Sequence, residues 1–190
     1  MIYKERIALI GSREPYDNIV RLSVEIGKFL SDNECSGFSG GASGMDSHFM
    51  QEFSFENSFI IVPERKPKIP KNFIIWDELD DDIKIRSYLQ AKRVCPDIDN
   101  RPLYHQKLFA RNSCQVLGVD CKTPVDRVIF WAKESKSGLV SGGTRIAVRI
   151  AREYDIPCHN LFKPDVRKQF EEMIGYKNRP TNLFDFMEVL

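Results

Sequence analysis

Three glycine-containing turns, each placed after an apolar run, constrain the fold of this 190-residue chain more than any other feature. The turn at 11–13, Gly-Ser-Arg, follows the apolar run 7–10, the second turn spans 39–44, and the third spans 137–144. Apolar residues at helical spacing follow these turns. Strands that alternate with helices through tight glycine turns predict right-handed crossovers and a parallel sheet.

The apolar pattern also predicts where the strands and helices lie. Between residues 17 and 32, Ile19, Leu22 and Ile26 recur at helical spacing, and Asp17 or Asn18 is available to cap the first turn. The expected strands are 6–10, 35–39, 58–63, 128–132 and 157–162. The expected helices are 17–32, 45–55, 103–116 and 145–154, followed by 165–174 and 183–190 as two helices or as a helix and an edge segment. We therefore predict an α/β protein with a Rossmann-like parallel sheet and helices on both faces.

We expect a single domain over residues 1–190, because the chain is long enough for one core and short for two. Prolines and an acidic run interrupt the regular pattern at 64–100. We expect this segment to be an inserted surface excursion, partly helical at 83–93, that serves as a lid, a binding loop or an interaction surface. Its apolar patch, 73–76, either anchors it to the body or stacks on a base. Residues 163–190 are expected to cover the sheet as a C-terminal segment.

Composition limits the partners of the chain. Lys and Arg together number 28 and Asp and Glu 27, so the chain lacks the broad basic field of a protein that coats nucleic acid through charge alone. A phosphate must therefore be bound by a few neighbouring residues and not by the overall charge of the chain. The N-terminal apolar run is too short for a signal peptide or a membrane span, and we expect a cytoplasmic protein without membrane contact. The five cysteines and three histidines have no metal-ligand spacing, so we expect reduced thiols, no metal and no cofactor.

Glycine turns at the carboxyl edge of a parallel sheet are typical of phosphate-binding sites. Glycine lets the backbone approach a ligand closely, and the next helix offers unpaired N–H groups and the positive end of its dipole. A β-branched side chain would fill the space of the phosphate, so valine at Gly41 or Gly143 is expected to abolish binding with modest loss of folding. The candidate ligand-binding residues of the turns are Gly11, Ser12, Arg13, Ser39, Gly40, Gly41, Ala42, Ser43, Gly44, Lys136, Ser141, Gly142, Gly143 and Thr144.

Two common nucleotide-binding motifs are missing from these turns. Neither of the two later turns ends in Gly-Lys-Ser/Thr, as the phosphate loop of ATPases does. The GxGxxG spacing of dinucleotide-binding dehydrogenases is not met after the first strand. The sequence therefore disfavours both of these enzyme classes.

The segment 39–46, SGGASGMD, resembles the glycine motif of the DNA-processing protein A family (DprA, or Smf), which belongs to the SLOG superfamily of Rossmann-like nucleotide binders. Residues 109–112, FARN, resemble that family's arginine-asparagine segment, and residues 136–147 resemble its last glycine loop and helix. The GGT at 142–144 is also similar to the YpsA-related SLOG proteins. The resemblance implies that Arg111 and Asn112 contact phosphate. Ser113 stands where the DprA segment usually has a second arginine, so one cation for a phosphodiester is missing.

Several functions remain open at this stage. The leading hypothesis is the binding of a nucleotide, a nucleotide-derived small molecule or single-stranded DNA, by a monomer or a homodimer. The first alternative is a nucleotide N-glycosidase or phosphoribosyl enzyme that uses Asp46 or Glu134 as its catalytic carboxylate. Its hydrolytic SLOG motif, PGGxGTxxE, is incomplete here, since 141–147 lacks both the proline and the glutamate. Asp46 also has a structural interpretation as a helix cap. The second alternative is an interaction or inhibitory protein that retains the fold.

Overall fold

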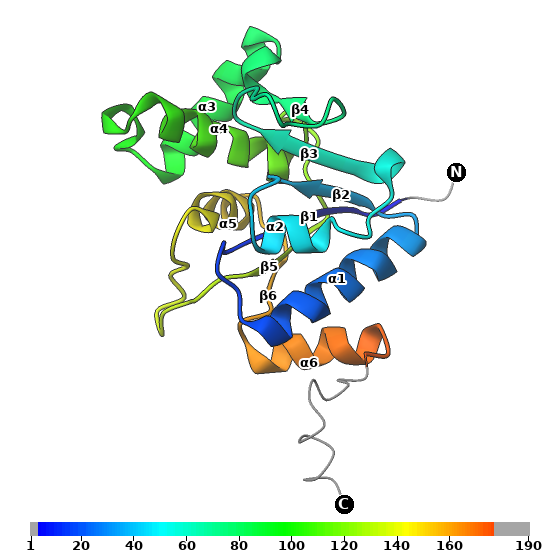
Figure 1. Ribbon diagram of the computed structural model, residues 1–190. Helices are drawn as coiled ribbons and strands as arrows, with labels where there is room; N and C mark the ends of the chain where they lie inside the picture. The colour runs from blue at the N-terminus through cyan, green and yellow to red at the C-terminus, as the bar shows by residue number, and fades with distance from the viewer. Residues whose placement is uncertain (1–3, 177–190) are drawn as a thin grey trace, which may run out of the picture.

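The computed structural model describes residues 4–176, which form one six-stranded sheet flanked by helices (Figure 1). The strands are β1 (Arg6–Gly11), β2 (Ser36–Ser39), β3 (Ser58–Val62), β4 (Ile74–Ile75), β5 (Arg127–Trp131) and β6 (Cys158–Asn160). Their order is β4-β3-β2-β1-β5-β6, and all five neighbouring pairs are parallel. The predicted Rossmann-like fold class is thereby confirmed.

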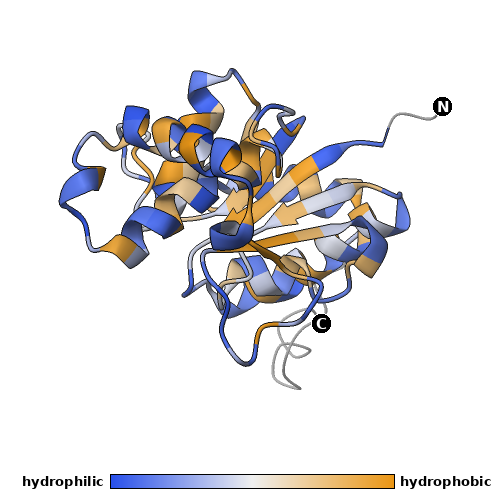
Figure 2. Cartoon of the chain, turned by 90° about the horizontal axis from the view of Figure 1, so that it is seen from above, coloured by the Kyte–Doolittle hydropathy of each residue, from blue (hydrophilic) through white to orange (hydrophobic). Residues whose placement is uncertain are grey.

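The helices cover both faces of this sheet because the buried strands alternate between two apolar cores. They are α1 (Asp17–Asp32), α2 (Met45–Phe49), α3 (Asp81–Val94), α4 (Leu103–Leu117), α5 (Thr144–Glu153) and α6 (Pro164–Met173). Ile7 and Leu9 of β1 belong to the core that includes α1, α2 and α6, whereas Ala8 and Ile10 belong to the core that includes α3, α4 and α5. Figure 2 shows hydrophobic residues gathered along the strands.

The segment 64–100 is more regular than the sequence predicts. β4 extends the sheet by pairing with β3, and α3 packs in the same core as α4. Trp76 is buried and donates its indole N–H to the Ser87 hydroxyl at 2.8 Å, so the apolar patch anchors the segment to the body. A two-residue strand carries too little periodicity to be predicted, because its pairing with β3 is a tertiary interaction.

Two expected elements are shorter in the structure. The helix expected over 45–55 ends at Phe49, because the chain turns back toward β3: the Ser54 N–H donates to the Ser31 hydroxyl of α1 at 2.8 Å, and the Phe53 ring covers Gly37. The strand expected over 157–162 is reduced to β6, since only its three residues pair with β5. The segment 183–190 lies outside the described residues.

The strand order places a natural ligand site at the carboxyl edge of the sheet. The connection after β1 moves toward β2, whereas β5 lies on the other side of β1. A crevice forms where two neighbouring strands send their chains in opposite directions, and ligands of open α/β sheets bind there. Within residues 4–176, no helix is long and apolar enough to cross a membrane.

Candidate functional site

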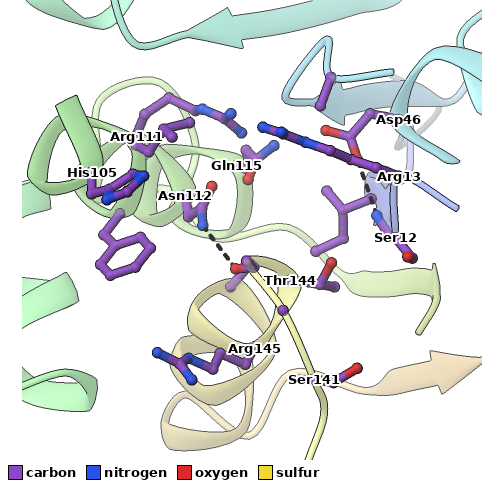
Figure 3. Close-up of a pocket in the computed structure, with 18 of the residues that line it drawn as sticks. Ser12, Arg13, Asp46, His105, Arg111, Asn112, Gln115, Ser141, Thr144 and Arg145 are labelled. Carbon is purple, nitrogen blue, oxygen red and sulfur yellow. Dashed lines mark hydrogen bonds between the residues drawn. The ribbon is translucent and has the colours of Figure 1, made fainter. Parts of the chain in front are cut away.

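A cavity of about 530 Å³ lies at this edge, between the ends of β1 and β5, helix α4 and the start of α5. Figure 3 shows the side chains that line it. The lining residues are Ile10, Gly11, Ser12, Arg13, Ala42, Asp46, Arg101, His105, Leu108, Phe109, Arg111, Asn112, Gln115, Ser141, Gly142, Gly143, Thr144, Arg145 and Ala147. All three glycine turns, together with the arginine-asparagine segment of α4, thus contribute to one cavity.

Asp46 holds two of the glycine turns together. Its side chain is 5% exposed, one carboxylate oxygen accepts the Gly11 N–H at 3.0 Å, and the other accepts the Gly40 N–H at 3.1 Å. Burial raises the pKa of Asp46, although Arg111 and the backbone N–H groups of Gly11, Ala42 and Gly40 favour its charged form. The carboxylate therefore has a structural role, because it joins the ends of β1 and β2.

Arg111 is the most unusual group of the cavity. It is 5% exposed, yet its guanidinium makes no hydrogen bond or ion pair with any residue in 4–176, and its Nε is buried without a partner. Burial lowers the pKa of Arg111, with the nearby Asp46 acting in the opposite direction. A buried guanidinium without a hydrogen-bond partner is costly, and the charge of the nearby Asp46 carboxylate offsets part of that cost.

Two further side chains face Arg111. Gln115, one turn further along α4, is 2% exposed, and its amide nitrogen is also buried without a partner. Arg13 reaches across from the turn after β1, so that the guanidinium groups of Arg13 and Arg111 point toward each other (Figure 3), and its charge contributes to lowering the pKa of Arg111. The two like charges repel each other, and the Asp46 carboxylate, which has the larger effect on Arg111, opposes this repulsion.

The start of α5 forms the opposite wall. Gly143 is the residue before the helix, no side chain caps its first turn, and the Asn112 amide donates to the Gly143 carbonyl at 3.2 Å. A Cβ atom at Gly142 or Gly143 would meet no atom within 4 Å, so the backbone here is open. Arg145 adds a guanidinium that makes no ion pair within the described part of the chain. Free N–H groups and a helix dipole end are thus available to an anion.

The structure brings together most, but not all, of the predicted ligand-binding residues. Ten candidate ligand-binding residues and the candidate catalytic residue Asp46 line the cavity. The ten are Gly11, Ser12, Arg13, Ala42, Arg111, Asn112, Ser141, Gly142, Gly143 and Thr144. Ser39, Gly40, Gly41, Ser43, Gly44 and Lys136 are not among its lining residues. Ser39 is fully buried and donates its hydroxyl to the Leu9 carbonyl at 2.7 Å, so it joins strands. Lys136 is exposed on the loop after β5.

Gly41 and Gly40 serve packing. Gly41 has φ +61°, and a Cβ there would lie 2.7 Å from Cγ2 of Ile60, so this glycine is required by backbone conformation and a close neighbour. A Cβ at Gly40 would lie 2.0 Å from Nη1 of Arg111 and 2.5 Å from Oδ2 of Asp46. Gly40 therefore leaves the space that these two side chains occupy.

Glu134 is the other candidate catalytic carboxylate of the sequence. It is not among the residues that line the cavity. Its side chain is 4% exposed and is held by Arg152 at 3.0 Å, by Lys163 at 3.4 Å and by the Asn160 amide at 2.9 Å. Burial acts to raise the pKa of Glu134, but these contacts outweigh it and the pKa lies below the ordinary value of 4.5. The carboxylate secures the base of the loop that leads to α5.

Four polar residues of the cavity were missed by sequence reasoning: Arg101, His105, Gln115 and Arg145. Three of them lie on or next to helices that were predicted, at positions where a solvated face is the ordinary expectation. Gln115 lies four residues after Arg111, and this spacing on one helix face is the one signal that could have found it. Of the arginines, Arg101 already pairs with Asp97, whereas Arg145 does not pair with an acid in 4–176.

No protein-family model matches the sequence, and no curated protein matches it. Similar solved structures include DNA processing protein A from Helicobacter pylori, described with a single-stranded DNA binding mode, which has a TM-score of 0.54 and 19% identity. The match covers 97% of this chain and 79% of that one. The likeness is one of fold.

A second solved structure has a similar fold at lower identity. The molybdenum cofactor binding protein from the phototrophic bacterium Rippkaea orientalis has a TM-score of 0.52 and 15% identity, over 100% of this chain and 98% of that one. The fold is therefore shared with a member of the family that the glycine turns resemble and with a cofactor-binding protein. The ligand of this chain must be argued from its own cavity.

Proposed function

We propose that the cavity binds a phosphate-bearing nucleotide. The observation that carries the proposal is a set of three arginines that form no ion pair within residues 4–176: Arg13, Arg111 and Arg145 come from three separate elements and line the same cavity. Only Arg111 has a carboxylate nearby, that of Asp46. Asp46 is the one carboxylate among the described lining residues, and its two oxygens already accept backbone N–H groups. Positive charge is thus in excess among the lining residues.

Phosphate fits the donors better than other anions do. A guanidinium engages two phosphate oxygens at once, and the backbone N–H groups at the start of α5 add donors beside Thr144. Phosphate oxygens accept from several directions, which suits donors that converge from the β1 turn, α4 and α5.

The remaining walls suit a nucleoside. Leu108, Phe109 and His105 of α4 and Ile10 of β1 line the same cavity as the arginines. Apolar and ring surfaces of this kind stack on a base or cover a sugar. The similar solved structures are described as binding single-stranded DNA and a molybdenum cofactor, but a likeness at 19% and 15% identity supports the fold alone. Single-stranded DNA therefore enters as a probe in the test.

We favour binding over N-glycoside hydrolysis. Hydrolysis needs a carboxylate that is free to assist departure of the base. Asp46 is engaged by Gly11 and Gly40, and Glu134 is engaged by Arg152, Lys163 and Asn160 away from the cavity. No other carboxylate lines the cavity within residues 4–176. We expect no release of free base when the protein is incubated with nucleoside monophosphates.

A thermal-shift series tests the proposal. The purified chain is heated with the four common nucleosides, with their 5′-monophosphates, and with a short single-stranded DNA. A ligand at about 100 times its Kd stabilises the folded state by about 2.7 kcal/mol, which for this chain length raises Tm by about 5–11 °C. We expect at least one monophosphate to raise Tm while its nucleoside does not. Equal Tm shifts for nucleoside and nucleotide would show that the phosphate does not contribute to binding. A Tm shift with DNA alone would show that the cavity binds the polymer.

A further inference from the structure

Helix α3, in the segment 64–100, carries an exposed apolar pair on its outer face. Ile85 is 57% exposed and Leu89 is 54% exposed, and the two residues lie one turn apart on the same side of the helix. The opposite side of the helix, with Ala91 and Val94, is buried in the core that includes α4 and α5. The outer face is therefore held in place, and covering its apolar pair would remove that surface from water.

Charged residues flank this pair at both ends. Asp82 lies one turn before the pair and Lys92 one turn after it, and both are exposed. Asp82 makes no ion pair within the described part of the chain. Lys92 pairs with Asp99 at 2.7 Å, but both of these side chains stay about half exposed. The positions 82, 85, 89 and 92 follow the 3-4-3 spacing of a seam between two helices.

This stripe is complementary to itself when two helices run antiparallel. In that orientation Ile85 of one copy meets Leu89 of the other, and Asp82 meets Lys92, because each pair lies symmetrically about position 87. A parallel orientation would instead place Asp82 against Asp82. The helix dipole also favours acids at a helix start and bases at a helix end. The dipole does not account for the apolar pair between them.

We propose that the outer face of α3 binds a second copy of this chain, antiparallel and about a two-fold axis level with Ser87. No residue of α3 lines the cavity, so this association does not occupy it, and the inference does not depend on the ligand. Figure 1 shows α3 on the side of the sheet opposite α1 and α6. A single helix pair is a small interface, and such interfaces form weak, transient dimers.

Sedimentation of the full chain at concentrations from about 10 µM to about 1 mM tests the proposal. We expect the average mass to rise from that of one chain toward that of two. Leu89→Glu places a charge in the apolar layer twice, once from each copy, and should raise the dissociation constant about tenfold or more. Ile85→Lys should have the same effect. Leu139→Glu is the matched control, because Leu139 is also 57% exposed but lies on the loop before α5.

Charge reversal tests the antiparallel arrangement. Asp82→Lys and Lys92→Glu each bring like charges together in a two-fold dimer, and each should weaken association about tenfold. The double variant, with both substitutions in one chain, restores opposite charges at each end and should associate with native affinity. All of these positions are exposed, so each variant should keep a Tm within about 2 °C of the native value.

Three outcomes would overturn the proposal. A native chain that stays monomeric at every concentration would show that α3 does not bind a second copy. A loss of association in Leu139→Glu equal to that in Leu89→Glu would show that exposed apolar residues act without a defined surface. Weak association in the double variant, or native association in both single charge variants, would contradict the antiparallel arrangement.

Discussion

Valine substitutions at Gly41 and Gly143 should have opposite effects, although the sequence predicts the same effect for both. At Gly143, φ is −67° and a Cβ would meet nothing within 4 Å, so valine should change the free energy of unfolding by about 0.5 kcal/mol or less. The added side chain stands where the start of α5 would receive phosphate. We expect Tm to stay within about 2 °C of the native value and nucleotide affinity to fall about tenfold or more.

At Gly41, valine should damage the fold instead. The left-handed backbone at φ +61° costs a non-glycine residue about 1–2 kcal/mol, and overpacking against Ile60 at 2.7 Å and Phe73 at 3.1 Å costs about 1–3 kcal/mol more. A total of about 3 kcal/mol lowers Tm by about 6–12 °C at this chain length. Thermal unfolding with and without a nucleoside 5′-monophosphate measures both quantities. Native affinity in Gly143→Val, or native stability in Gly41→Val, would refute the reasoning.

Three other substitutions follow from the same contacts. Asp46→Asn removes one of the two acceptors for the Gly11 and Gly40 N–H groups and should lower the free energy of unfolding by about 1–3 kcal/mol in urea denaturation. An unchanged denaturation midpoint would contradict the role of Asp46 in joining the two turns. Glu134 has a pKa below its ordinary 4.5, so its contribution to stability is present above that pH and is lost as the pH falls through its lowered pKa. Glu134→Gln should therefore flatten the acid side of the stability profile while leaving nucleotide affinity native, and a loss of affinity would return Glu134 to the site. Gly40→Ala places a methyl group against Arg111 and Asp46 and should weaken nucleotide binding in a titration, whereas native affinity would show that Arg111 can move aside without loss of binding.

The sheet and its ligand edge could be predicted because their signals are local. The helix expected over 17–32 has the bounds of α1, and the turn expected at 11–13 and the end of the turn expected at 137–144 line one cavity. Each depends on an apolar run, a glycine and a helical repeat that are adjacent in sequence. The second glycine turn shows the limit of this reasoning. Its glycines suggest phosphate binding, but two of them have a structural reason. The backbone conformation requires a glycine at position 41, and the crowded side chains around Gly40 leave no room for a Cβ there.

What could not be predicted depends on contacts between distant residues. Glu134 is a plausible catalytic carboxylate in sequence, and only the structure pairs it with Arg152, Asn160 and Lys163. Arg111 was implied by resemblance, but its lack of a hydrogen-bond partner within residues 4–176 is a property of the folded chain. The same holds for Arg145, whose spacing in sequence does not distinguish it from a solvated arginine.

Calorimetric titration of the best-binding nucleoside 5′-monophosphate into the native chain and into the Arg111→Met and Gly143→Val variants, at low and at moderate salt, tests the central claim most directly. The claim is that the cavity recognises phosphate through its unpartnered arginines and the open start of α5. The account predicts binding to the native chain that weakens as salt rises, no measurable binding of the corresponding nucleoside, and a loss of about tenfold or more in at least one variant. Nucleotide binding that is insensitive to salt, and equal in all three proteins, would contradict it.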